Sequence, residues 1–201
     1  MEDRNSSNAV TLQDALLLHQ QGQLADAEKI YRKLLSNQPD NSDAMHSLGV
    51  LCHQKGATTE AVAYFEKSLS QNPDSADTYF NLGIAFHKLG KFEEAIAAYR
   101  HSVVLEPTNI SPYYNLGNAL LELGRFEEAA AAYETFLECE PESVTARYNF
   151  GLANMYAHNY EAAITAYQAA LKIRPNFLEA WTNLGTTLLE IGQAEAALDA
   201  Y

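Results

Sequence analysis

The sequence predicts an all-α protein, an α-solenoid in which one helix-turn-helix repeat of 34 residues recurs six times. Four residue types recur with this step and carry the prediction. Prolines stand at Pro39, Pro73, Pro107, Pro141 and Pro175, and glycines at Gly49, Gly83, Gly117, Gly151 and Gly185. Alanines stand at Ala27, Ala61, Ala95, Ala129, Ala163 and Ala197, and aromatic residues at Tyr31, Phe65, Tyr99, Tyr133, Tyr167 and Tyr201. A shared period in four residue types indicates stacked structural repeats.

The repeats are numbered here from position 1 to position 34. A polar lead of residues 1–7 precedes them, and their bounds are 8–41, 42–75, 76–109, 110–143, 144–177 and 178–201, with the last repeat truncated. Positions 4, 7, 8 and 11 lie on one face of a helix, so they predict the buried side of the first helix. The glycine at position 8 then allows a neighbouring helix to approach closely.

A glycine at position 15 predicts the turn to the second helix, which in repeat 3 includes residues 92–103. The alanine at position 20 leaves room beside position 8, and the aromatic residue at position 24 fills the space between repeats. The proline at position 32 ends the connection to the next repeat, because it lacks an N–H and restricts the residue before it. Polar residues after this proline are candidate N-caps. They include Asp40, Asn41, Ser42, Asp74 and Ser75.

Repeat 5 departs from the pattern at three positions. It has Arg147 at position 4, Asn154 at position 11 and His158 at position 15. A polar residue at a core position predicts a locally weaker or wetter interface. Ordinary drift between repeats explains the same departure without a functional role.

The pattern of apolar, Leu, Gly, apolar, Ala, aromatic and Pro positions resembles the tetratricopeptide repeat (TPR), over residues 8–201. The resemblance implies a right-handed superhelix of paired helices that holds a protein segment in its concave groove. A weaker resemblance rests on the recurring asparagines and on "AEKIYRKLLSNQPDNSDAMHSLGVLCHQKG". These are similar to the TPR regions that precede O-GlcNAc-transferase-type glycosyltransferases, which implies, as an alternative, the substrate-recognition region of a larger enzyme.

Position 6 faces the groove that the resemblance implies, and it carries an asparagine in four successive repeats. An asparagine offers both a donor and an acceptor, so it can pair with the backbone of an extended peptide. Aromatic residues at position 5 and a second amide at position 9 flank these asparagines. The predicted peptide-binding residues are Asn81, Asn115, Asn118, Asn149, Asn183, Phe80, Tyr114 and Tyr148. The alternative is that the asparagines are helix-surface residues without a binding role.

The charge pattern restricts the partners that we expect. The formal net charge is −13, which argues against binding to nucleic acids or to anionic membranes. The TPR groups that bind acidic peptide tails use groove lysines, but Tyr114 stands at the expected lysine and Glu179 lies nearby. A neutral or basic protein segment therefore suits this groove better than an acidic one.

No motif for catalysis or for a cofactor appears, so we expect a non-enzymatic chain without cofactors. His19, His53 and His87 recur with the repeat period. However, packed helices about 8–10 Å apart cannot readily bring three imidazoles onto one zinc ion. Cys52 and Cys139 form no redox or metal motif, and Cys52–His53 is weak as a nucleophile pair.

The two ends of the sequence lead to further expectations. The start lacks the features of a signal peptide and no run of about 18 apolar residues occurs, so we expect a cytoplasmic protein. Repeat 6 stops at Tyr201 without a polar capping helix, which predicts that the chain belongs to a longer protein. Self-association through this uncapped end is a further option.

Overall fold

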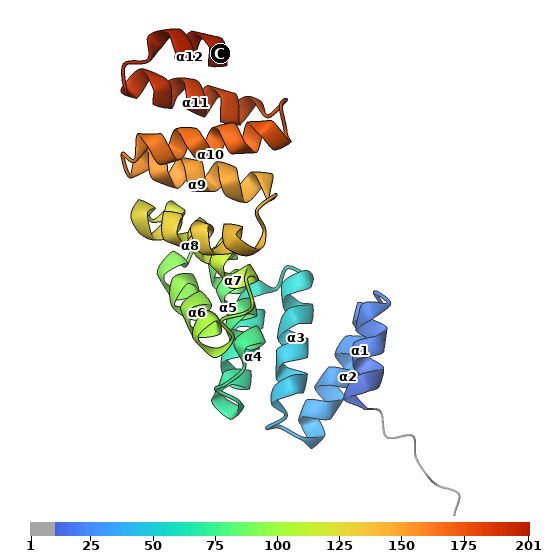
Figure 1. Cartoon of the computed structure of the whole chain (residues 1–201). Helices are drawn as coiled ribbons and strands as arrows, with labels where there is room; N and C mark the ends of the chain where they lie inside the picture. The colour runs from blue at the N-terminus through green and yellow to red at the C-terminus, as the bar shows by residue number, and fades with distance from the viewer. Residues whose placement is uncertain (1–10) are drawn as a thin grey trace, which may run out of the picture. The chain divides into compact units, whose positions relative to one another are not determined.

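The structure, a computed structural model, describes residues 11–201, and in that range it contains twelve α-helices and no strand (Figure 1). The predicted all-α fold is therefore confirmed, while the polar lead of residues 1–7 lies outside the described residues. None of the helices in residues 11–201 is both long enough and apolar enough to cross a membrane.

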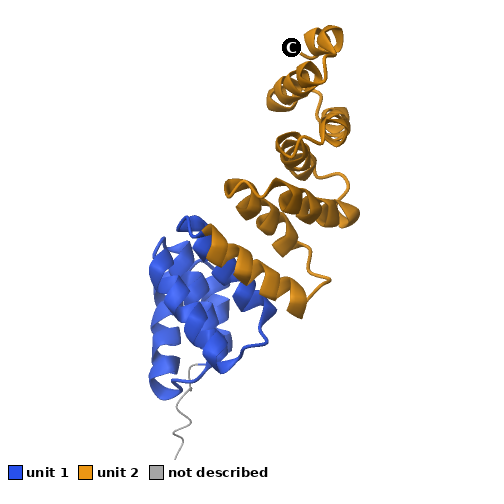
Figure 2. Ribbon diagram, turned by 90° about the vertical axis from the view of Figure 1, so that its left-hand side faces the viewer, with its two compact units in different colours: residues 1–91 blue, residues 92–201 orange. Residues whose placement is uncertain are grey.

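The chain divides into two compact units, residues 1–91 and residues 92–201, which Figure 2 distinguishes by colour. The helices of the N-terminal unit are α1 (Leu12–Gln20), α2 (Leu24–Asn37), α3 (Ser42–Gln54), α4 (Thr58–Gln71) and α5 (Ala76–Lys88). Those of the C-terminal unit are α6 (Phe92–Leu105), α7 (Ser111–Glu122), α8 (Phe126–Cys139), α9 (Val144–Tyr156), α10 (Tyr160–Ile173), α11 (Leu178–Glu190) and α12 (Ala194–Ala200). Within each unit, helices pack on their neighbours in sequence, as in a solenoid.

The helix bounds follow the 34-residue numbering. Helices α3, α5, α9 and α11 begin at position 1, and helices α2, α4, α6, α8 and α10 all span positions 17–30. Asn41 caps α3 by accepting a hydrogen bond from the Ala44 amide at 2.9 Å, as predicted. Ser75 caps α5 in the same way, through the Thr78 amide at 3.3 Å.

The turn between the helices of a repeat requires a positive φ at position 15. The glycines there have φ between 70° and 83°, and His158 adopts the same region with φ 59°. This conformation is rare for a residue with a side chain, so His158 is tolerated where the other repeats use glycine.

In repeats 2, 4, 5 and 6, a close packing contact joins the glycine at position 8 to the aromatic ring at position 24. A Cβ atom added at Gly117 would lie 2.7 Å from Cε1 of Tyr133, and one at Gly151 would lie 2.7 Å from Cε1 of Tyr167. The close neighbour predicted for this glycine is thus the second helix of its own repeat. Tyr167 also belongs to a buried cluster with Ala180 and Leu184 of α11, so the ring fills the space between repeats as well.

The polar departure in repeat 5 is satisfied internally. Asn154 is only 4% exposed, and its Nδ2 donates to the Phe150 carbonyl at 2.8 Å. Its Oδ1 accepts a hydrogen bond from Asn159 Nδ2 at 3.0 Å. Both ends of the buried amide are paired, so the expected wetter interface is not needed to explain this residue.

The buried tyrosine hydroxyls at position 24 find partners on the first helix of their own repeat. The Tyr31 hydroxyl lies 3.3 Å from Nδ1 of His19, and the Tyr133 hydroxyl donates to Asn118 Oδ1 at 2.7 Å. Repeat 2 has Phe65 instead of tyrosine, and there the buried Nδ1 of His53 has no hydrogen-bond partner. The missing hydroxyl of Phe65 explains this unpaired nitrogen.

Replacing Gly117 by leucine should destabilise the chain by about 1–3 kcal/mol, because the added side chain overpacks the buried ring of Tyr133. Asn115→Ala on the same helix should change the free energy of unfolding by less than about 0.5 kcal/mol. Chemical denaturation measures both variants. Equal losses of stability would contradict the packing described for position 8.

Replacing Phe65 by tyrosine should stabilise the chain by about 0.5–1.5 kcal/mol, because the new hydroxyl can pair with His53 Nδ1 as Tyr31 pairs with His19. Thermal and chemical denaturation of this variant test the gain. The same substitution combined with His53→Leu should show no gain, since the partner is then absent.

Candidate peptide-binding face

In the C-terminal unit, the predicted asparagines lie on the first helices of three successive repeats. Asn115 is on α7, Asn149 on α9 and Asn183 on α11, and all three are partly buried. Asn115 Nδ2 donates to the Ser111 carbonyl one turn earlier, at 3.1 Å. This hydrogen bond stays within one helix.

Asn118 joins three helices at one point. Its Oδ1 accepts hydrogen bonds from the Tyr133 hydroxyl at 2.7 Å and from Asn149 Nδ2 at 3.2 Å. It therefore links α7 to α8 and to α9. Burial raises the pKa of Tyr133, so its hydroxyl stays protonated and remains a donor.

Asn183 makes the next contact along the same face. Its Nδ2 donates to the Tyr148 hydroxyl at 3.0 Å, which links α11 to α9. Asn149 and Asn183 therefore also contribute to the packing of the fold. Both amides connect consecutive repeats, a role that depends on contacts 31 and 35 residues apart in the chain.

The asparagines keep part of their hydrogen-bonding capacity. An asparagine amide has two N–H donors and one carbonyl oxygen. Asn115, Asn149 and Asn183 each use one N–H in a hydrogen bond, and no group in residues 11–201 is seen to donate to their Oδ1 atoms. Asn115 thus keeps one N–H donor and its acceptor for a ligand. The amides of Asn149 and Asn183 also interact with the hydroxyls of Tyr133 and Tyr167, so these two residues keep chiefly their Oδ1 acceptors.

The two flanking tyrosines are anchored by neighbouring rings. Tyr114 packs against Tyr133 and Phe136, with ring centroids 5.9 and 5.3 Å apart. Tyr148 packs against Tyr167 and Phe177, at 5.9 and 4.9 Å. Both are half-buried, so they are held in place and present only part of each ring to a ligand.

Burial also raises the pKa of Tyr148, and nearby Glu179 adds to this while the hydrogen bond from Asn183 opposes it. The hydroxyl beside the asparagines is therefore neutral at physiological pH. It can serve the candidate face as a donor or acceptor without adding charge.

In the N-terminal unit, the equivalent face carries Asn81 and Phe80 on α5, both partly buried. Asn81 Nδ2 donates to the Asp77 carbonyl at 3.0 Å, the same one-turn contact that Asn115 makes. Phe80 and Asn81 lie one step apart on the helix, as the sequence predicts.

A cavity of about 270 Å³ opens on the first-helix side of this unit, and Asp43, His46, Ser47 and Asp77 contribute to its lining. His46 Nδ1 lies 2.8 Å from the Thr78 hydroxyl. Burial lowers the pKa of His46, although Asp77 and Asp43 act in the opposite direction. The neutral imidazole leaves the two aspartates as the charged groups of this cavity.

The first of the regularly spaced histidines, His19, makes local contacts. His19 contacts Tyr31 through Nδ1 and lies 2.8 Å from Gln54 Oε1 through Nε2. Among residues 11–201, no three His, Cys, Asp or Glu side chains come close enough to hold a metal ion. Cys52 is buried, and burial raises its pKa to about 11, so this thiol is a poor nucleophile.

Family-level comparison matches tetratricopeptide repeat profiles to residues 12–76 and 114–176, and to residues 64–97 and 166–199. A third TPR repeat profile matches residues 85–124. The chain belongs to the tetratricopeptide repeat family. No curated protein matches the chain by sequence.

Solved structures with the same fold include two proteins named MamA and YrrB. MamA 41-end from Desulfovibrio magneticus RS-1 is 21% identical, with a TM-score of 0.74 over 79% of this chain and 90% of that one. Another structure of MamA is 25% identical, with a TM-score of 0.72 over 76% and 90%. YrrB, described as a TPR protein with an unusual peptide-binding site, is 19% identical, with a TM-score of 0.79 over 85% and 88%.

Replacing Asn118 by alanine should destabilise the chain by about 1–3 kcal/mol, because the buried Tyr133 hydroxyl loses its acceptor. Chemical denaturation measures the effect, and Asn115→Ala serves as the matched control on the same helix. Adding Tyr133→Phe should recover most of the loss, since no unpaired hydroxyl then remains. A double variant that is less stable than Asn118→Ala would contradict the role given to Asn118.

Proposed function

We propose that the chain is a non-enzymatic interaction scaffold that holds an extended protein segment on its first-helix face. The observation that carries the proposal is that the asparagine amides use only part of their hydrogen-bonding capacity within the chain. Asn115 keeps one N–H and its carbonyl oxygen after making its own contact, and Asn149 and Asn183 keep their carbonyl oxygens. Because a peptide backbone offers one acceptor and one donor at each non-proline residue, this face can bind a segment without specifying its sequence.

Preorganisation supports this proposal. Asn149 and Asn183 are oriented by the hydrogen bonds to Asn118 and Tyr148, so their amides lose little conformational freedom when a peptide binds. Tyr148 is likewise held by its ring contacts with Tyr167 and Phe177. A binding surface that is already ordered gains affinity because less entropy is lost on association.

The charges beside the candidate residues of each unit favour a neutral or basic segment over an acidic one. Asp43 and Asp77 line the cavity of the N-terminal unit, and exposed Glu179 lies beside the asparagines of the C-terminal unit. An acidic peptide would meet these carboxylates without a compensating cation. YrrB, a TPR protein with an unusual peptide-binding site, agrees in kind with this proposal.

The alternative, that the chain recognises substrates for an O-GlcNAc-transferase-type enzyme, stays a prediction. The same asparagine contacts would serve a substrate segment as well as any other partner. The sequence beyond Tyr201 decides between the two: a long α/β segment favours the enzyme, and a capping helix followed by a stop favours the scaffold.

The test begins with a peptide selected from a displayed random library on the wild-type chain, followed by calorimetry. Asn115→Ala should weaken binding about 3- to 10-fold, the effect of one hydrogen bond, and leave stability nearly unchanged. The quadruple Asn→Ala variant at 81, 115, 149 and 183 should weaken it further. Methylation of the peptide's backbone nitrogens should have a larger effect than exchange of its side chains.

Asn176→Ala, an exposed amide in the connection before α11, is the matched control and should bind normally. Circular dichroism establishes that each variant keeps its helices. A folded quadruple variant that binds the peptide with wild-type affinity would overturn the proposed role of the asparagines.

A further inference from the structure

Hollows recur between the second helices of consecutive repeats, away from the asparagines. Three of them lie between α2 and α4, between α6 and α8, and between α8 and α10. Their volumes are about 580, 270 and 630 Å³, respectively. The residue at position 4 contributes to each lining, and it is Met45, Tyr113 and Arg147 in turn. The smallest hollow is thus the one that holds an aromatic residue at this position.

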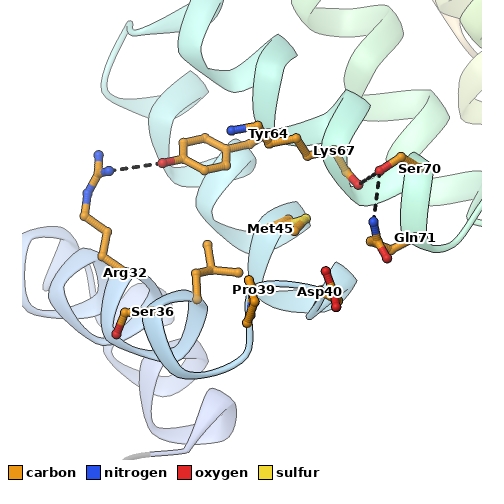
Figure 3. Close-up of a pocket in the computed structure, with 10 residues that line it drawn as sticks. Arg32, Ser36, Pro39, Asp40, Met45, Tyr64, Lys67, Ser70 and Gln71 are labelled. Atoms are coloured by element: carbon orange, nitrogen blue, oxygen red, sulfur yellow. Dashed lines mark hydrogen bonds between the residues drawn. The ribbon is translucent and has the colours of Figure 1, made fainter.

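An ion pair crosses two of these hollows, from position 25 of one repeat to position 19 of the next. Arg32 on α2 pairs with Glu60 on α4 at 3.0 Å, and Figure 3 shows the same guanidinium reaching the Tyr64 hydroxyl. Arg100 on α6 pairs with Glu128 on α8. In both cases a guanidinium of the chain lies at the hollow and pairs with a glutamate on the opposite helix.

The hollow between α8 and α10 has neither an aromatic residue at position 4 nor an ion pair across it. Position 25 is Glu134 and position 19 is Ala162, so no ion pair can form across it. At position 4, the Arg147 side chain donates from Nε to the Pro141 carbonyl at 2.6 Å. The equivalent residue in the next repeat is Trp181, whose Nε1 donates to the Pro175 carbonyl at 2.8 Å. Repeat 5 thus keeps this hydrogen bond without the aromatic ring.

The lining of this hollow combines apolar side chains with unpaired carboxylates. Leu137, Phe150, Ala162 and Ala166 supply apolar surface from three helices. Three glutamates also line it, namely Glu134, Glu138 and Glu161. No ion pair involves these glutamates within residues 92–201, and they outnumber the single guanidinium of Arg147.

We infer that the hollow between α8 and α10 is a second docking site, which takes an apolar side chain flanked by lysine or arginine from a partner protein. The volume lies in the range of about 300–1,000 Å³ that is usual for ligand pockets. The apolar side chain would cover Phe150 and Leu137, and the flanking cations would meet the glutamates that the chain leaves unpaired. None of its lining residues belongs to the candidate peptide-binding face, so both sites can be occupied together.

The discriminating variant is Arg147→Trp, which should fill the hollow and keep the hydrogen bond to the Pro141 carbonyl, as Trp181 does with Pro175. This variant makes the chain more acidic. Nonspecific attraction of basic peptides would therefore persist or increase, whereas specific docking should be lost. Peptides are selected from a displayed random twelve-residue library on the wild-type chain, with the Arg147→Trp chain as counter-target to remove peptides that bind elsewhere.

We expect the selected peptides to share one large apolar residue flanked by at least two lysines or arginines. A synthetic copy of such a peptide should bind Arg147→Trp at least tenfold more weakly than wild type. The double variant Glu134→Gln/Glu138→Gln should also bind at least tenfold more weakly. The matched control Glu94→Gln/Glu127→Gln removes the same charge from exposed positions of α6 and α8, and it should bind normally.

Methyl chemical shifts of Leu137, Ala162 and Ala166 should change saturably with the peptide, which places it in the hollow. The inference is overturned if the selection yields no apolar-basic pattern or if Arg147→Trp binds the peptide as wild type does. Equal weakening in the two glutamine double variants would also overturn it, since binding would then follow total charge and not the site.

Discussion

The contact between the position-8 glycine and the position-24 ring, seen in repeats 2, 4, 5 and 6, is the constraint on which the rest of these repeats depends. At Gly117 even a single added carbon would lie 2.7 Å from the ring of Tyr133. The glycine therefore brings the two helices of a repeat close together, and the ring becomes fully buried. Once the ring is buried, its hydroxyl needs a partner, because an unpaired buried polar group costs free energy. In repeats 1 and 4, His19 at position 12 and Asn118 at position 9 meet that need.

This dependence connects the core with the candidate binding face. Tyr133 donates to Asn118, and Asn118 in turn accepts a hydrogen bond from Asn149 of the next repeat. A buried hydroxyl thereby orients an amide at the surface. The same residues serve stability and recognition, so loss of binding in an asparagine variant is informative only when its stability is measured beside it.

Repeat 5 departs from the repeat pattern in two ways. A departure is compensated when other residues of the chain supply the missing contacts, and uncompensated when they do not. Asn154 is compensated, because Phe150 and Asn159 satisfy its buried amide. His158 accepts a backbone conformation that glycine adopts more readily. Arg147 keeps one hydrogen bond but leaves the aromatic volume unfilled, and the acidic side chains nearby stay unpaired. Uncompensated departures of this kind mark places where an external partner can contribute the missing contacts.

The succession of paired helices, the turn at position 15 and the buried side of each first helix were predictable from the sequence. These features depend on interactions within about one repeat, so they leave a periodic pattern of residue types. The sequence also placed the asparagines correctly on the first helices.

The partners of those asparagines could not be predicted, because Asn118–Asn149 and Tyr148–Asn183 join residues more than 30 positions apart. Side-chain direction and packing between repeats decide such contacts. The hollow between α8 and α10 could not be predicted either. It exists because the side chains of Arg147, Glu134 and Ala162 leave space between three packed helices. Periodicity determines which residues face inward, whereas the assembled helices determine which of their polar groups remain for a partner.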